Sequence, residues 1–179
     1  ETINFDEKDW DNLIILDACR YDVMETKNPF DVEVKSVYSN ASHTHEFLEK
    51  NFSGKYPDTV YVTSSPQVAQ FGGEFAHIER VWKSKWSNEN NTVMPEDLVD
   101  EALKISRDYP DKRLVVHFMQ PHFPFINSDV EQGSYRGSDK GRKLPSIWER
   151  MYAGEVDEDK VRKDYENNLE IALPELERL

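Results

Sequence analysis

The chain has 179 residues, of which 37% are hydrophobic and 12% aromatic. This is enough for one domain with a buried core, or for a large part of a bigger one, since domains commonly run to about 100–200 residues. The formal net charge of -13 argues against nucleic acid as a general partner, because such a field repels a phosphate backbone.

Two further classes are excluded by composition. No apolar run approaches the roughly 20 residues that a membrane span needs, so no membrane span is expected. Cys19 is the only cysteine, which rules out an intrachain disulfide and a cysteine-rich zinc site. A chain of this kind is typical of a reducing compartment, and we therefore expect a cytoplasmic location.

Short apolar runs predict the strands of a sheet. The first, at 12–17, is continuous and stops at Asp17, which is the pattern of a strand buried on both faces with a functional carboxylate at its carboxyl end. Similar runs predict further strands at 32–38, 59–63 and 113–119, with a weaker one at 76–82.

Helical patterns lie between and after these runs. Pro95 and the two acids that follow it open a helix whose apolar residues recur to Tyr109. The stretch 127–145 is rich in Gly, Ser, Asp and Lys and predicts a loop or lid over the active-site edge. A last helix is expected over 157–179, with Pro174 bending its far end. The apolar stripe of this helix is Val161, Tyr165, Leu169, Ala172 and Leu176.

Because strands and helices alternate, the sequence predicts an α/β fold: a three-layer sandwich around a central, mainly parallel sheet. Residues 1–179 are expected to form a single α/β domain or the amino-terminal portion of one.

Candidate site residues lie where the apolar runs end, since open α/β sheets bind ligands beyond the carboxyl ends of their strands. Asp17 ends the first run, and its carboxylate is a hard ligand for a divalent metal. His122, held in a loop between two prolines, could donate to an anionic oxygen, and His117 lies in the predicted strand before that loop. The alternatives are a helix cap for Asp17 and a core histidine with satisfied hydrogen bonds for His117.

The third candidate is a pair of hydroxyls, Ser42 and Thr44, at a predicted helix start. A hydroxyl there faces the unpaired N–H groups of the first turn, where a phosphoryl or sulfuryl group would be held while the hydroxyl attacks it. The alternative is a simple N-cap, because Ser and Thr are common caps.

Together these segments resemble the alkaline phosphatase superfamily. The run Asp17-Ala-Cys-Arg20-Tyr-Asp22 is similar to the D-G-x-R-x-D/E metal motif of its phosphodiesterase branch, and Ser42 and Thr44 lie where the superfamily keeps its nucleophile. The run Met119-Gln-Pro-His122-Phe-Pro-Phe is similar to the P-H-x-P-F segment of sulfatases and lipoteichoic-acid-synthase-like phosphotransferases. The later run Tyr165-Glu-Asn-Asn-Leu is similar to the Y-x-x-x-L helix of sulfatase-like proteins.

The resemblance implies an alkaline-phosphatase-like fold and a metal-dependent hydrolase or transferase for phosphate, less readily sulfate, esters of small molecules, lipids or glycans. It implies that Asp17 and Ser42 bind a divalent metal: Zn, Mn, Ca or Mg. Ser42 is preferred as nucleophile because it stands four residues before Glu46-Phe, as in the T-x-x-x-E-F spacing of the phosphotransferases, and Thr44 is the alternative.

Three other residues are expected to take part, of which His122 is implied by the resemblance. His122 would steady the transferred group, and His117 and Arg20 would contact the substrate. For Arg20, a pair with Asp22 is an equal alternative.

The chain also departs from the family. The C/S-x-P-x-R motif of formylglycine sulfatases is absent from the sequence, and so is the D-H-G that completes the metal site. Asp17 and Ser42 would then supply half of a metal site. The resemblance therefore implies the amino-terminal part of a longer enzyme, or a catalytically inactive sulfatase-like binding module, and the isolated chain is expected to bind metal weakly and turn over little.

A haloacid-dehalogenase-type phosphatase with Asp17 as nucleophile is disfavoured, since it needs an acid where this chain has Cys19.

Overall fold

The computed structural model describes residues 5, 9–70, 73–132 and 145–179. Its centre is a four-stranded sheet in the order β1-β6-β2-β3, and every neighbouring pair of strands is parallel. The strands are β1 (Asn12–Leu16), β2 (Lys55–Thr63), β3 (Glu74–Arg80) and β6 (Arg113–Phe118). A separate antiparallel pair is formed by β4 (Trp86–Ser87) and β5 (Thr92–Val93). The predicted α/β class with a parallel central sheet is confirmed.

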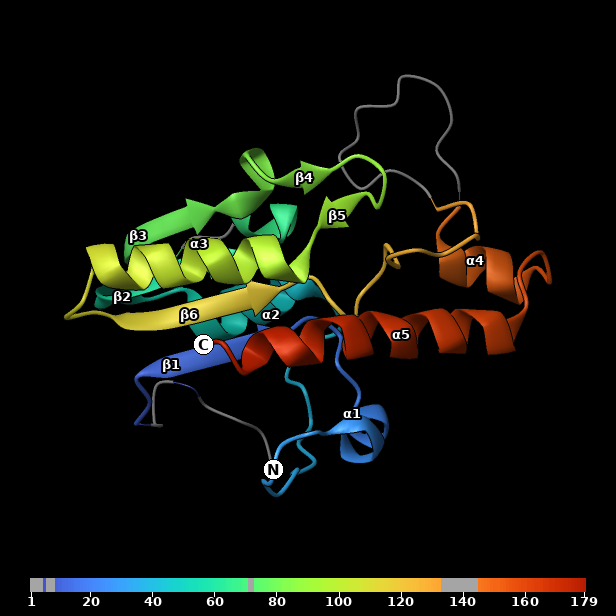
Figure 1. Ribbon diagram of the computed structural model, residues 1–179, viewed down its shortest axis with the longest axis horizontal. Coiled ribbons are helices and arrows are strands. Elements are labelled where there is room, and N and C mark those ends of the chain that lie inside the picture. Colours follow the sequence, from blue (N-terminus) through green and yellow to red (C-terminus); the bar gives the residue numbers. More distant parts are fainter. Residues whose placement is uncertain (1–4, 6–8, 71–72, 133–144) are drawn as a thin grey trace.

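Helices cover both faces of this sheet (Figure 1). One face carries α3 (Pro95–Asp108) and α5 (Glu158–Leu176), and the other carries α2 (Thr44–Phe52). The shorter elements are α1 (Tyr21–Lys27), α4 (Ile147–Tyr152) and the 3-10 turns η1 (Pro66–Gln70) and η2 (Val81–Lys83).

The alternation of side chains along β2 explains the layers. Val60 and Val62 belong to the core on the α3 side, whereas Tyr61 packs with Leu48 and Phe52 of α2. Successive side chains of a strand point to opposite faces, so a central strand with apolar residues at consecutive positions is covered on both sides.

Local signals at the helix starts account for the two long helices. In α3, Pro95 opens the first turn and Glu96 and Asp97 follow it, which suits the positive end of the helix dipole. In α5, the side chain of Asp157 caps the helix by accepting from the backbone N–H of Lys160 at 2.9 Å. Both predicted helices are confirmed, and α5 continues past Pro174 to Leu176.

Two predictions about strands are wrong. The stretch 32–38 forms no strand: Val32 is 63% and Tyr38 79% exposed. Its β-forming residues do not suffice because a strand needs a partner to pack against. Residues 13–16 of β1 are only partly buried, since β1 lies at an edge of the described sheet.

The predicted loop at 127–145 lies mostly outside the described residues, which omit 133–144. Within the described part of the chain, none of the helices combines the length and apolar character that crossing a membrane requires.

A substitution in the core under α5 tests this packing. Leu169 is fully buried in a cluster with Val23, Phe125 and Val161. Leu169→Ala should lower the free energy of unfolding by about 2–5 kcal/mol, because it removes apolar contacts and leaves a cavity. Lys163→Ala, at an exposed position of the same helix, should change it by less than about 0.5 kcal/mol in the same denaturant titration. Equal effects would mean that α5 does not pack as described.

Candidate functional site

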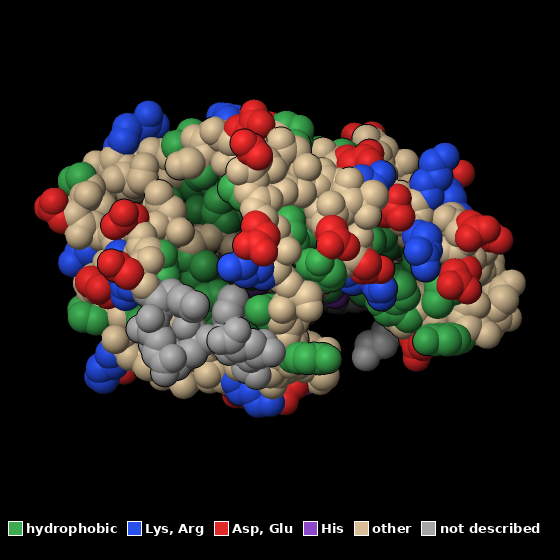
Figure 2. Space-filling view, turned by 90° about the horizontal axis from the view of Figure 1, so that it is seen from below, with side chains coloured by type: hydrophobic (Ala, Val, Ile, Leu, Met, Phe, Trp, Pro, Cys, Tyr) green, Lys and Arg blue, Asp and Glu red, His purple; other side chains and the backbone are tan. Residues whose placement is uncertain are grey.

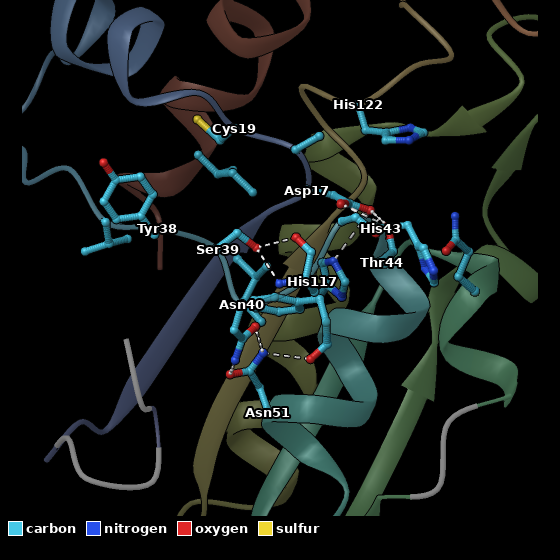
Figure 3. A pocket seen from close by; sticks show the side chains of 18 of the residues that line it. Asp17, Cys19, Tyr38, Ser39, Asn40, His43, Thr44, Asn51, His117 and His122 are labelled. Carbon is cyan, nitrogen blue, oxygen red and sulfur yellow. Dashed lines mark hydrogen bonds and ion pairs between the residues drawn. The ribbon is translucent and has the colours of Figure 1, made fainter. Parts of the chain in front are cut away.

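A pocket of about 600 Å³ lies at the carboxyl edge of the sheet. Its walls bring together residues from three places in the sequence, as expected where parallel strands end (Figure 3). Asp17 follows β1, His117 lies near the end of β6 with His122 in the loop beyond, and Ser42 and Thr44 stand at the start of α2.

Among the residues that line this pocket, Thr44 contacts Asp17. The Thr44 hydroxyl Oγ1 donates to Asp17 Oδ2 at 2.9 Å and lies 3.2 Å from Oδ1. Thr44 is 7% exposed and the Asp17 side chain 13% exposed. The structure thus pairs the strand-end carboxylate with Thr44, whereas the sequence had favoured Ser42.

Ser42 lines the same pocket but has a different partner. Its Oγ and its backbone N–H donate to Glu46 Oε2 at 2.9 and 2.8 Å, and the backbone N–H of Glu46 donates to His43 Nδ1. The ammonium of Lys50 and the two donors of Ser42 lower the pKa of Glu46 to about 2. The spacing of Ser42 and Glu46, from which Ser42 was predicted as nucleophile, serves here to bond the residue before the N-cap, His43, to the first turn of the helix.

His117 is buried at the pocket wall, with 1% of its surface exposed. Its Nδ1 is 2.8 Å from the hydroxyl of Tyr61, and its Nε2 is 3.9 Å from Asp17 Oδ2. Nε2 has no hydrogen-bond partner among the described residues. Burial lowers the pKa of His117, which favours the neutral ring. His117 is therefore not a core histidine with both nitrogens satisfied.

His122 lies at the pocket beside Asp17. Its backbone N–H donates to the carbonyl oxygen of Asp17 at 3.1 Å, which ties the two strand-end loops together. The ring stacks on Phe123 with centroids 4.5 Å apart, and Nδ1 donates to the Phe123 carbonyl oxygen.

Arg20 stands outside the set of residues that line this pocket. Its Nε and terminal nitrogen donate to the two carboxylate oxygens of Asp22 at 2.9 and 2.7 Å. Of the two alternatives for Arg20, the structure contains the pair with Asp22, and contact with a substrate stays a prediction.

The turn after Asp17 is held by a side chain from the far end of the sequence. Ala18 has φ of 58°, a conformation that is uncommon for a residue with a Cβ. Tyr165 of α5 donates its hydroxyl to the Ala18 carbonyl at 2.8 Å and accepts from the Arg20 N–H at 2.9 Å. Burial raises the pKa of Tyr165 to about 12, so the hydroxyl keeps the proton that it donates.

One helical turn further on, Asn168 holds the loop that carries His122. Asn168 Nδ2 donates to His122 O at 3.0 Å and lies 3.3 Å from the carbonyl oxygens of Pro121 and Pro124, while Oδ1 accepts from Ile126 N at 2.9 Å. Asn168 is not among the site residues predicted from the sequence. The available signal was an amide three residues after Tyr165 and next to Leu169, on the apolar face of a predicted helix.

The described residues offer part of a metal-ligand set. No group of three or more His, Cys, Asp or Glu side chains that could hold a metal ion occurs among them. The Asp17 carboxylate is bonded by the Thr44 hydroxyl, and the unpartnered His117 Nε2 is 3.9 Å from Asp17 Oδ2.

Comparison with protein-family models, with curated proteins and with solved structures found no match. The fold and the pocket define the chain as an α/β protein with a polar site at the carboxyl edge of a parallel sheet. The resemblance to the alkaline phosphatase superfamily therefore rests on the sequence motifs of this chain alone.

The amide of Asn168 can be tested by a small change. Asn168→Asp replaces the Nδ2 donor with a carboxylate that faces the carbonyl oxygens of residues 121, 122 and 124. We expect the free energy of unfolding to fall by about 2 kcal/mol or more, since buried groups lose their hydrogen bonds. Asn167→Asp is the matched control at the exposed neighbouring position and should stay within about 0.5 kcal/mol. Similar losses in both variants would contradict the role given to Asn168.

Cys19 should be a poor nucleophile. It packs against the cluster around Val23, and burial raises its pKa to about 11. Because the thiolate is the reactive form, alkylation by iodoacetamide at about pH 8 should be at least about tenfold slower in the folded protein than in denaturant. Cys19 is the only cysteine, so the label reports on it directly. Equal rates would show an accessible, reactive thiol.

Proposed function

We propose that the protein hydrolyses or transfers phosphate esters, with Thr44 as nucleophile and a divalent cation as cofactor. The observation that supports this most is the hydrogen bond of 2.9 Å from the Thr44 hydroxyl to the Asp17 carboxylate. It lies in a pocket, at the first turn of a helix and at the carboxyl edge of a parallel sheet. This arrangement brings together the attacking hydroxyl of Thr44, the Asp17 carboxylate that accepts its proton, and a helix start that attracts anions.

In the proposed reaction, Thr44 Oγ1 attacks phosphorus and the bond from phosphorus to the leaving alcohol oxygen breaks. The hydroxyl proton passes to Asp17 and from there to solvent, and the departing alkoxide takes a proton from water. Water then attacks the phosphothreonine, which restores the hydroxyl and releases phosphate. In transferase chemistry, an acceptor alcohol replaces that water.

Asp17 and Thr44 are the residues that would hold the cation. The donor set fits, because the described contacts of the Asp17 carboxylate are with a hydroxyl and a neutral imidazole, so its negative charge lacks a positive partner among them. When bound, such a cation would supply positive charge to the phosphoryl oxygens. His122, at the same pocket, would hold the transferred group.

Exposed apolar side chains in the lining of the pocket suit an ester with an apolar or ring-shaped alcohol. Val37, Tyr38 and Trp148 line it and are 46%, 79% and 41% exposed. Aromatic faces left in water favour binding to apolar or sugar surfaces. Phosphate is preferred over sulfate because the formylglycine motif is absent from the sequence.

A second candidate is a binding module that holds such an ester without reacting with it. It is favoured by the incomplete ligand set among the described residues, in which no group of three potential metal ligands of the His, Cys, Asp or Glu type occurs.

A comparison of Thr44 and Ser42 variants tests the proposed nucleophile. Turnover of 4-nitrophenyl phosphate and bis(4-nitrophenyl) phosphate is measured with Mn²⁺, Zn²⁺, Mg²⁺ or Ca²⁺, using the natural protein at its full encoded length. Thr44→Ala should lower the rate by at least about a thousandfold, because it removes the attacking atom. Ser42→Ala should leave the rate within a few fold, since the Ser42 hydroxyl bonds Glu46 and not Asp17, and Thr44→Ser should retain part of the activity.

Mass spectrometry of the quenched reaction should find the phosphoryl group on Thr44. Circular dichroism of each variant controls for folding. A Thr44→Ala protein that still turns over the ester would contradict the proposal. Tight ester binding without turnover in the unmodified protein would favour the binding module.

A further inference from the structure

The Nε2 of His117 is a buried polar atom at the pocket. The residue is 1% exposed, and Nε2 has no hydrogen-bond partner among the described residues. Asp17 Oδ2 is 3.9 Å away from it, which is too far for a hydrogen bond. A buried nitrogen without a partner is costly, so its placement beside a carboxylate points to a bound ligand.

We propose that His117 Nε2 is a third ligand of the divalent cation held by Asp17 and Thr44; this inference rests on the proposed function. The separation of 3.9 Å is shorter than the sum of a metal–nitrogen and a metal–oxygen bond, each about 2.0–2.2 Å. One cation can therefore touch both atoms. The Thr44 hydroxyl is bonded to the same Asp17 oxygen, at 2.9 Å.

The surroundings of His117 hold the ring in place for this role. The hydroxyl of Tyr61 contacts Nδ1 at 2.8 Å, so the other nitrogen is the one left for a ligand. A hydrogen bond to the second ring nitrogen orients a metal-binding histidine. The backbone is fixed as well: His117 pairs with Ile15 and Thr63 in the two adjacent strands, and Ser64 donates to the His117 carbonyl through both N–H and Oγ.

This ligand set also indicates which cation would bind. An imidazole nitrogen with a carboxylate and a hydroxyl suits Zn²⁺ or Mn²⁺, whereas Ca²⁺ and Mg²⁺ prefer oxygen ligands alone. The proposed site therefore favours a transition metal or zinc over the alkaline-earth cations.

Binding of Mn²⁺ alone tests the inference independently of catalysis. The 179-residue chain is titrated with MnCl2 and followed by electron paramagnetic resonance, and pulsed measurements detect coupling of the bound ion to a nitrogen nucleus. The unmodified chain should show ¹⁴N coupling. His117→Asn removes Nε2 while keeping a polar atom near Tyr61, and it should abolish the coupling. Asp17→Asn should weaken Mn²⁺ binding more than His117→Asn does, because it removes the charged ligand.

Two other variants separate ligation from folding. Tyr61→Phe keeps the ring packing but removes the partner of Nδ1, so it should weaken Mn²⁺ binding by about tenfold or more while the ¹⁴N coupling persists. His77→Asn changes a histidine on β3 outside the pocket that contacts Glu79, and it should alter neither affinity nor coupling.

Bound Mn²⁺ without nitrogen coupling, coupling that survives in His117→Asn, or an unmodified chain that binds no Mn²⁺ would overturn the inference. None of these results decides whether Thr44 is the nucleophile, which the ester assay with Thr44→Ala measures separately.

Discussion

Two hydrogen-bonding side chains of α5 fix the loops that form the site. The Tyr165 hydroxyl forms hydrogen bonds to the backbone of Ala18 and Arg20, in the turn after Asp17. The Asn168 amide donates to the backbone carbonyl of His122 in the second loop. These loops follow neighbouring strands, β1 and β6, and the His122 N–H to Asp17 carbonyl bond connects them directly. A helix about 150 residues away in sequence therefore sets the geometry at the first strand's end.

The polar groups of the pocket are held by an apolar framework. Tyr61 and Val115 pack against α2 on the same side of the sheet as His117, and α3 and α5 cover the opposite side. In such surroundings a carboxylate and an unpartnered imidazole nitrogen interact strongly with any charge placed between them, because little water screens them.

Acidic and basic side chains are mixed over the outer face seen in Figure 2, where hydrophobic side chains are visible in the hollows.

Much of the fold follows from pattern alone. The apolar runs of β2 and β6 and the helical periods of α3 and α5 are strong, and each is confirmed. The stretch 32–38 has the composition of a strand, yet it remains largely exposed, because pairing depends on which neighbours the rest of the chain brings near. Likewise, an edge and a central strand can have similar sequences, and β1 reads as central although it lies at an edge of the described sheet.

The sequence by itself determined the class of fold, because the period of apolar residues in strands and helices is a local property. It also determined the strand ends at which polar residues collect, because parallel sheets bind ligands beyond the carboxyl ends of their strands. It also determined that hydroxyls stand near a helix start. Only the tertiary structure decided which hydroxyl meets Asp17. Ser42 and Thr44 lie on either side of His43, the N-cap of α2, so that Ser42 bonds Glu46 whereas Thr44 bonds Asp17 at the end of β1. The partners of His117, Tyr165 and Asn168 were likewise decided by packing, because each contact joins residues more than 40 positions apart.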